Sequence, residues 1–246
     1  MHAGRYPIRV GISGWSLLSR TERDMLPGRG PVLARYGRLL EAVEVNTTFY
    51  RSHAPETYRR WAEQVPEEFR FAVKMPGWLT HRGRLRRLEG LERFIAEVQH
   101  LGPKLGPVLV QLPPSLRFCA QAAEVFFRAL RDRFSGPVAC EAREASWFSE
   151  EADRLLADLR IARVVADPAP VAGELWPGGW PEWVYVRLHG RPMYYGVYEE
   201  EEIRRWAERL LGWSASAPVW CFFNNTASAR ALEAACRLRQ MLSGCL

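Results

Sequence analysis

Charged side chains stand at or just after the ends of several short apolar runs in this sequence. Asp and Glu can accept protons, and Lys and Arg pair with anions, so a group of both kinds could bind an anionic ligand and move protons on it. The carboxylates are Glu44, Glu141 and Asp167, and the cations are Lys74, Arg143 and Arg187. A structural alternative stays open, in which three carboxylates and three cations neutralise one another as an ion-pair network.

His189 is the candidate general acid or base among the five histidines. An ordinary histidine has a pKa near 6.5 and exchanges protons at neutral pH. The alternative for His189 is a packing role, hydrogen-bonded to a neighbouring carboxylate. We predict His189, Glu44 and Glu141 as catalytic residues. The predicted substrate-binding residues are Asn46, Lys74, His81, Gln111, Arg143, Asp167, Arg187 and Asn224.

Lys74 could also form an imine, because a lysine that is desolvated beside other cations becomes nucleophilic. We expect Glu44 and Glu141 to keep this lysine charged, which favours anion binding over imine formation. Lys74, Arg143 and Arg187 lie near the C-terminal ends of the third, fifth and seventh runs, and alternate strands of a barrel contribute to the same layer. An adventitious anion is therefore expected between these three strand ends.

The elements that must position these residues alternate regularly along the chain. Eight strand-sized apolar runs are separated by longer amphipathic segments, which predicts a parallel sheet covered by helices. The runs are Arg9–Ser13, Ala42–Asn46, Arg70–Lys74, Val108–Leu112, Val138–Ala142, Arg163–Asp167, Trp183–Leu188 and Val219–Phe223. The predicted helices are Val32–Leu40, Pro55–Gln64, Glu89–Leu101, Ala122–Phe134, Glu150–Leu159, Glu199–Leu211 and Ala227–Leu242. The segment Pro168–Pro181 is predicted to be a loop.

Eight units in 246 residues predict an α/β fold, a single-domain (β/α)₈ TIM-like barrel over residues 1–246. An open doubly wound sheet is the runner-up, but no Gly-rich phosphate turn follows the first run. Residues two apart share a strand face. One face is wholly apolar and should meet the helices; in the sixth run it holds Val164 and Ala166. The other face carries the polar residues, Asp167 included, and should line the lumen and its mouth.

An ordered set of short motifs carries a family resemblance. The motifs are Gly14-Trp15-Ser16, Glu44-x-Asn46-x-Thr48-Phe49-Tyr50, Lys74 with Thr80-His81, Gln111-Leu112-Pro113-Pro114-Ser115, Glu141-x-Arg143-x-x-Ser146-Trp147, Tyr185-x-Arg187-Leu188-His189-Gly190 and Phe223-Asn224-Asn225. Together they resemble the YecE-like family, also called domain of unknown function 72, from about Ile8 to about Leu242. The resemblance implies a TIM-barrel fold and brings no established reaction with it.

Composition narrows the classes of function. The five cysteines form no CxxC pair, the first nine residues hold no apolar signal segment, and no run reaches the length of a membrane span. We expect a cytoplasmic protein that has no membrane partner. The sequence has no P-loop or GxGxxG motif for a nucleotide cofactor and no HExxH or DxD spacing for a metal, so we predict neither. A divalent metal stays open as an alternative, with nitrogen and oxygen ligands from His189, Glu44, Glu141 and Asp167.

Three functions remain open from the sequence. The first is an enzyme, a hydrolase, lyase or isomerase, that acts on a small anionic or sugar-like (polyhydroxylated) ligand at the barrel mouth. The second is a nucleic-acid-binding or repair-type, endonuclease-like barrel, which the net charge of +6 and the loop aromatics favour. The third is a barrel that binds a ligand without catalysis. The sequence indicates no oligomeric state.

Overall fold

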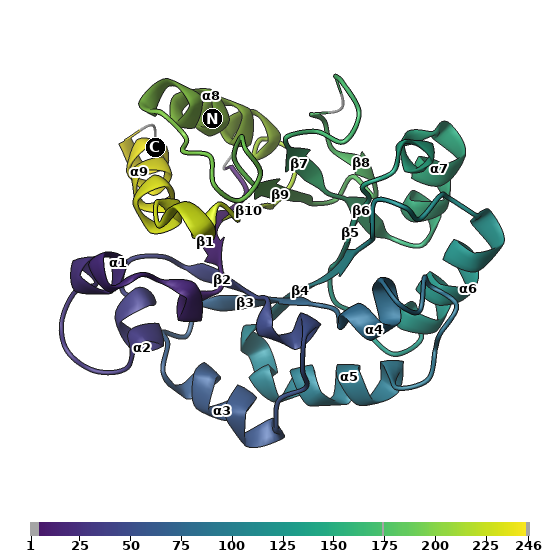
Figure 1. Cartoon of the computed structure of the whole chain (residues 1–246), viewed down its shortest axis with the longest axis horizontal. Helices are drawn as coiled ribbons and strands as arrows, with labels where there is room; N and C mark the ends of the chain where they lie inside the picture. The colour runs from purple at the N-terminus through teal and green to yellow at the C-terminus, as the bar shows by residue number, and fades with distance from the viewer. Residues whose placement is uncertain (1–4, 174, 245–246) are drawn as a thin grey trace.

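The computed structural model of this protein describes residues 5–173 and 175–244. Its strands follow one another around a central axis, and the helices surround them on the outside (Figure 1). The strands are β1 (Ile8–Ser13), β2 (Ala42–Val45), β3 (Arg70–Lys74), β4 (Leu105–Gln111), β5 (Val138–Glu141), β6 (Ile161–Arg163), β7 (Val165–Asp167), β8 (Gly178–Gly179), β9 (Val184–Leu188) and β10 (Val219–Phe223). The predicted α/β barrel is confirmed.

The sheet closes because one extended segment changes its partner halfway along. β6 pairs in parallel with β5, and β7, which follows after Val164 alone, pairs in parallel with β9. The sheet continues from β9 through β10, β1, β2, β3 and β4 to β5. Residues 161–167 thus act as the sixth of eight barrel strands. The two-residue strand β8 lies outside this ring and pairs antiparallel with β6.

The helices cover the outside of the barrel through their apolar faces. They are α1 (Arg20–Met25), α2 (Val32–Tyr36), α3 (Pro55–Glu63), α4 (Gly77–Thr80), α5 (Leu91–Val98), α6 (Ala120–Arg131), α7 (Glu150–Asp158), α8 (Glu200–Trp213) and α9 (Ala231–Gly244). In α6, for example, Phe126, Phe127 and Leu130 are fully buried. Ser149 begins α7 by accepting a hydrogen bond from the Ala152 amide, which satisfies one free donor of the first turn.

Local signals misplaced some helix boundaries. The predicted helix Glu89–Leu101 ends at Val98, and a 3₁₀ segment, Gln99–Lys104, continues from it to the strand. The predicted helix Ala227–Leu242 begins four residues later, because Ala229 has a left-handed backbone with φ 55°. The short helices α1 and α4 were not predicted. Segment 168–181 contains no helix in its described part, as expected. No described helix has the length and apolar character that crossing a bilayer requires.

Two apolar layers hold the barrel together. The outer layer joins one face of the strands to the helices, and it includes Val10, Val43, Val110 and Leu188. The lumen is filled differently: β10, β9 and the residue before β9 contribute bulky aromatic rings, and β2, β3, β5 and β6 contribute small side chains. The aromatic residues are Trp183, Tyr185, Trp220 and Phe222, and the small ones are Ala42, Ala72, Ala139 and Ala162. Large and small residues therefore interlock across the axis.

The predicted faces of the sixth strand are wrong. Val164 packs in the lumen cluster and Val165 in the outer layer, so Asp167, two residues beyond Val165, does not belong to the lumenal face. Alternation of types misled here, because the charged residues of this strand share its odd positions and so resemble a lumenal face, whereas ion pairs satisfy them on the outward face. Arg163 shares the outward face and binds Asp153 of α7 through its Nε at 2.7 Å.

We predict that the lumen is too tightly packed at Gly11 to accept one methyl group. A β-carbon there would lie 2.2 Å from the Ala42 carbonyl oxygen and 3.0 Å from the Phe222 ring. Gly11→Ala should lower the free energy of unfolding in urea by about 1–3 kcal/mol. The matched control is Gly212→Ala in α8, where no atom lies within 4 Å. It should be neutral or raise stability by up to about 1 kcal/mol. Equal effects of the two variants would contradict this account of the lumen.

Candidate active site

A fully buried arginine joins two carboxylates across the upper part of the barrel. Arg187, from β9, donates through Nη2 to Glu44 Oε1 at 2.7 Å and through Nε to Glu44 Oε2 at 2.9 Å. Its Nη1 donates to Glu141 Oε2. All three side chains are 0 % exposed. This two-pronged arrangement is the geometry in which an arginine fork binds a carboxylate most strongly.

The remaining acceptor capacity of Glu44 is also used. Ser13, at the end of β1, donates its hydroxyl to Oε1 at 2.9 Å, and Tyr185 of β9 donates to Oε2 at 2.8 Å. Tyr185 belongs to the aromatic layer below, so its hydroxyl ties the apolar lumen to the charged layer. Glu44 is predicted as a catalytic residue, and the structure places it where no solvent reaches it.

Glu141 is the second hub of the network. It accepts from Gln111 Nε2 at 2.8 Å and from His189 Nε2 at 2.8 Å, and Arg143 Nη2 lies 2.9 Å from its Oε1. Burial opposes its ionisation, but Arg187, Arg143 and His189 outweigh burial and hold the pKa of Glu141 well below its ordinary value. Glu141 is therefore an ionised anchor at neutral pH.

His189 has both ring nitrogens engaged. Nε2 donates to Glu141, and Nδ1 accepts from Asn224 Nδ2 at 2.9 Å. These partners assign the tautomer that carries its proton on Nε2. Burial lowers the pKa of His189 more than Glu141 raises it, so the ring is neutral at pH 7. The packing interpretation of His189 thus describes its contacts, and its role as an acid or base stays a prediction.

Lys74 differs from the other cations of the site. Its side chain is 9 % exposed, and its Nζ lies 4.1 Å from the centre of the Phe49 ring. Within the described part of the chain, Nζ makes no hydrogen bond or ion pair. Burial, and then the charge of Arg187, lower the pKa of Lys74 to about 8, while Glu44 and Glu141 raise it. The two carboxylates thus raise the pKa of Lys74 as expected, but burial and Arg187 outweigh them, and the amine stays mainly protonated at pH 7.

Asp167 lies apart from this network. Its carboxylate accepts from Arg191 Nη2 at 2.6 Å and from the Tyr198 hydroxyl at 3.0 Å, because the sixth strand turns this position away from the lumen. The charged layer therefore contains the two carboxylates Glu44 and Glu141 against three cations. Arg187 is enclosed between those carboxylates, so the expected anion position narrows to the neighbourhood of Lys74 and Arg143.

A cavity of about 340 Å³ opens directly above the network. Three predicted binding residues line it, His81, Gln111 and Arg143, together with Met193 and Tyr194 from the loop after β9. Burial and the charge of Lys74 lower the pKa of His81, so its ring is neutral at pH 7. Asn46 follows β2, and its buried Oδ1 has no hydrogen-bond partner among the described residues. This volume suits a small ligand.

Some members of the site were not predicted. Ser13 and Tyr185 bind Glu44, and spacing offered a signal for Tyr185, which stands two residues before Arg187 on the same face. Phe49 contacts Lys74, and Met193 contacts Arg143. Both lie outside the strands and α-helices, so no periodicity in the sequence indicates where their side chains point. In the described part of the chain, no group of three or more His, Cys, Asp or Glu residues could hold a metal ion.

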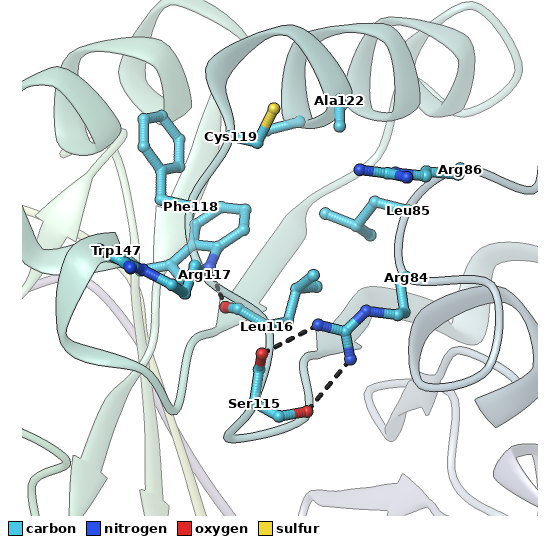
Figure 2. Close-up of a pocket in the computed structure, with 11 residues that line it drawn as sticks. Arg84, Leu85, Arg86, Ser115, Leu116, Arg117, Phe118, Cys119, Ala122 and Trp147 are labelled. Carbon is cyan, nitrogen blue, oxygen red and sulfur yellow. Dashed lines mark hydrogen bonds between the residues drawn. The ribbon is translucent and has the colours of Figure 1, made fainter.

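A second cavity of about 320 Å³ lies beside the mouth (Figure 2). Pro114 lines the mouth cavity and Ser115 lines the second one, so the loop after β4 separates them. Arg84, Arg86 and Arg117 surround the second cavity, and Arg84 donates to the Ser115 hydroxyl at 3.1 Å and carbonyl at 2.9 Å. Trp147 at its base donates to the Leu116 carbonyl at 2.9 Å and anchors the loop.

The fold and site define a (β/α)₈-barrel protein with a charged, largely buried layer below a polar cavity at the carboxyl ends of its strands. The family described as "Protein of unknown function DUF72" matches residues 9–245. The chain belongs to this family, and the resemblance stated from its motifs is confirmed.

Relatives agree with this assignment over different lengths. The chain is 38% identical to the UPF0759 protein YecE of Escherichia coli K12 over 82 residues, 33% of this chain and 30% of YecE. It is 28% identical to the UPF0759 protein YunF of Bacillus subtilis 168 over 154 residues, 58% of this chain and 52% of YunF. These matches thus span only part of each relative. A crystal structure of a DUF72 family protein from Thermotoga maritima MSB8 has 26% identity and a TM-score of 0.79, covering 97% of this chain and 100% of that one.

Removing the central cation should leave two buried carboxylates without their main partner. We expect Arg187→Met to lower the free energy of unfolding by about 3–5 kcal/mol, measured by urea titration. Arg128→Met removes an exposed pair with Glu124 in α6 and should change stability little. Substituting Glu44→Gln in the Arg187→Met background should recover part of the loss. A cost of Arg187→Met as small as that of Arg128→Met would contradict the central role of this arginine.

Proposed function

We propose that this protein is an enzyme that acts on a small, anionic, hydroxyl-bearing substrate in the cavity at the barrel mouth. The observation that carries the proposal is the charge balance of the layer beneath that cavity. Glu44 and Glu141 are bound by Arg187, and Lys74 is a buried cation to which the described residues offer no anionic partner. A buried charge is costly unless it is paired, so an anionic ligand would supply what the chain omits.

His81, Gln111 and Arg143 line the cavity, and Lys74 lies near enough to His81 and Arg143 for their charges to interact. Asn46 follows β2, the strand next to the one that ends with Lys74. These residues have complementary roles in this proposal. Arg143 and Lys74 bind the anionic group, Arg143 through its planar fork and Lys74 as a point charge. Asn46 accepts a hydrogen bond from a substrate hydroxyl, which would satisfy its unpartnered Oδ1. His81 is neutral and lines the cavity, so it can take up or release a proton on the substrate. Gln111 donates to Glu141 and borders the same space.

The buried residues act mainly by holding these groups in place. Glu141 orients Arg143, His189 and Gln111, and Asn224 fixes the ring of His189 from the other side. Proton transfer at a bound hydroxyl or carbonyl is common to hydrolysis, elimination and isomerisation. His189 joins the transfer if the substrate displaces Arg143, whose Nη2 lies 3.1 Å from His189 Nε2. Asp167 would contribute from the rim through Arg191.

Anion binding tests the proposal directly. Inorganic phosphate should bind the protein in calorimetry, and Lys74→Met and Arg143→Met should each lower its affinity roughly tenfold, about 1.4 kcal/mol, because each removes one charged contact. Arg204→Met, on the exposed side of α8, is the control and should leave the affinity unchanged. Adding Mg²⁺ or EDTA in parallel reports whether a divalent ion takes part. Phosphate binding that neither mouth variant weakens would reject the site.

A second candidate function rests on a separate observation, the arginine-rich loop after α4. Arg82, Arg84, Arg86 and Arg87 occur within six residues, and Arg117 faces two of them across the second cavity. No acidic residue lines that cavity in the described part of the chain. Clustered arginines beside aromatic side chains are typical of surfaces that contact nucleic-acid phosphates and bases. We propose nucleic-acid binding along this rim as the alternative.

Salt dependence separates the two candidates. If the rim binds nucleic acid, affinity for single- or double-stranded DNA should fall steeply with salt, because phosphate contacts release counterions. The triple substitution Arg84→Gln, Arg86→Gln and Arg117→Gln should reduce the slope of log affinity against log salt by about 2–3, close to one per lost contact. Arg128→Gln on α6 is the matched charge control. No DNA binding at low salt in filter-binding or anisotropy measurements would reject this alternative.

A further inference from the structure

The choice of basic residues in this chain is strongly uneven. Of its 34 basic residues only Lys74 and Lys104 are lysines, and the remainder are arginines. Arginine and lysine serve equally well on most solvated surfaces, but only lysine loses its proton within the range of protein chemistry. The two positions that carry lysine are therefore places where the structure should show a reason for a primary amine.

Lys104 has a structural reason. Its Nζ donates to the carbonyl oxygens of Ala62 at 2.6 Å and Val65 at 2.7 Å, so it binds the backbone at the end of α3. A compact ammonium suits two carbonyls that lie this close together. Lys74 has no such contact: among the described residues its Nζ meets only the face of the Phe49 ring. No hydrogen bond or ion pair in the described part of the chain therefore accounts for Lys74, although only 9 % of it is exposed.

We propose that Lys74 is a nucleophile that forms an imine with a small aldehyde or ketone bearing an anionic group. The inference rests on the proposed function, since it places the substrate in the same cavity, and it adds the chemical class of that substrate. Arg143, which lines the cavity, would bind the anionic group. Lys74 does not line the cavity itself, but its charge interacts with those of Arg143 and His81 in the cavity wall, so a carbonyl carbon held beside them would be within reach of Nζ. Met193 Sδ, 3.6 Å from Arg143 Nη1, steadies that guanidinium.

The reaction balances with water as its only other product. The neutral amine of Lys74 forms a bond to the carbonyl carbon, and the carbonyl oxygen takes up a proton to become a hydroxyl. The nitrogen then loses one proton and the hydroxyl, protonated in turn, leaves as water. The product is a protonated imine, whose positive nitrogen withdraws electrons from the neighbouring carbon and eases loss of a proton there. His81 is the neutral side chain at the cavity wall that could accept that proton.

The groups around Lys74 explain why its amine is available. Burial disfavours its charge most, Arg187 from β9 and Arg143 after β5 add to that effect, and Glu44 of β2 and Glu141 of β5 favour the charge. The carboxylates are engaged by Arg187, so the cations and the dry surroundings prevail. His81, beyond α4, is neutral and adds no charge. The pKa of about 8 leaves roughly a quarter of the Lys74 amine neutral at pH 7.5, against about a thousandth for an ordinary lysine.

Trapping with a reductant tests the inference on the whole protein. Glyoxylate is the probe, because it is both an aldehyde and an anion, and cyanoborohydride converts any imine into a stable secondary amine. Peptide mapping by mass spectrometry should show Lys74 labelled on the order of tenfold faster than Lys104, since its larger neutral fraction outweighs its lower intrinsic nucleophilicity. The rate at Lys74 should rise with pH and reach half its maximum near pH 8. Equal labelling of the two lysines would overturn the proposal.

Controls separate this inference from the proposed function. Lys74→Arg removes the primary amine and should abolish the adduct at that position, while binding of glycolate, the alcohol that matches glyoxylate, is measured on the parent protein. Its thermal unfolding is compared with that of the parent protein to verify the fold. If glycolate binds the parent protein but glyoxylate leaves Lys74 unlabelled, the imine is rejected and the anion site stands. If glycolate does not bind and no adduct forms, both proposals fail.

Discussion

The structure depends most on the buried contact of Arg187 with Glu44 and Glu141. Charges removed from water cost several kcal/mol each, and only good geometry and further hydrogen bonds offset that cost. Each polar residue around the contact serves this need. Ser13 and Tyr185 donate hydrogen bonds to Glu44. Gln111 and His189 donate to Glu141, and Arg143 forms an ion pair with it. Strands β1, β2, β4, β5 and β9 must therefore keep one relative register, and the aromatic layer beneath, which includes Tyr185, holds them there.

The contact of Arg187 with Glu44 and Glu141 also determines the charge environment of Lys74 at the barrel mouth. Arg187 binds both carboxylates, and these compensate Lys74 only in part, because burial and the charge of Arg187 lower its pKa more than Glu44 and Glu141 raise it. Three carboxylates and three cations would have formed a balanced ion-pair network. The orientation of the sixth strand prevents this balance. The sixth strand turns Asp167 outward to Arg191 and Tyr198, and the layer keeps one cation more than it has carboxylates. A structural network thus supports a site that can receive a ligand.

Much of this could be predicted from the order of residue types. The eight runs, the barrel and the polar face followed from alternation along strands, because a strand between helices and lumen must be apolar on at least one side. Prediction failed where the alternation of residue types is misleading or absent. In the sixth strand the charged residues Arg163 and Asp167 lie on the outward face, so alternation assigned Asp167 to the wrong side. The left-handed residue Ala229, which delays α9, lies in a stretch whose composition suits a helix. Loop residues such as Phe49 and Met193 have no period at all, so their approach to Lys74 and Arg143 could not be anticipated.

The sequence by itself determined the family, the barrel and the gathering of Glu44, Lys74, Gln111, Glu141, Arg143, Arg187 and His189 at one end of it. These follow from local order, since a period of two assigns faces and chain direction assigns ends. Only the tertiary structure decided which of these charges are satisfied and which is left over. That outcome depends on distances of 2.7–2.9 Å between residues more than a hundred positions apart, such as Glu44 and Arg187. Electrostatic energy varies with the separation and burial of the charges, and the order of the residues does not give either quantity directly.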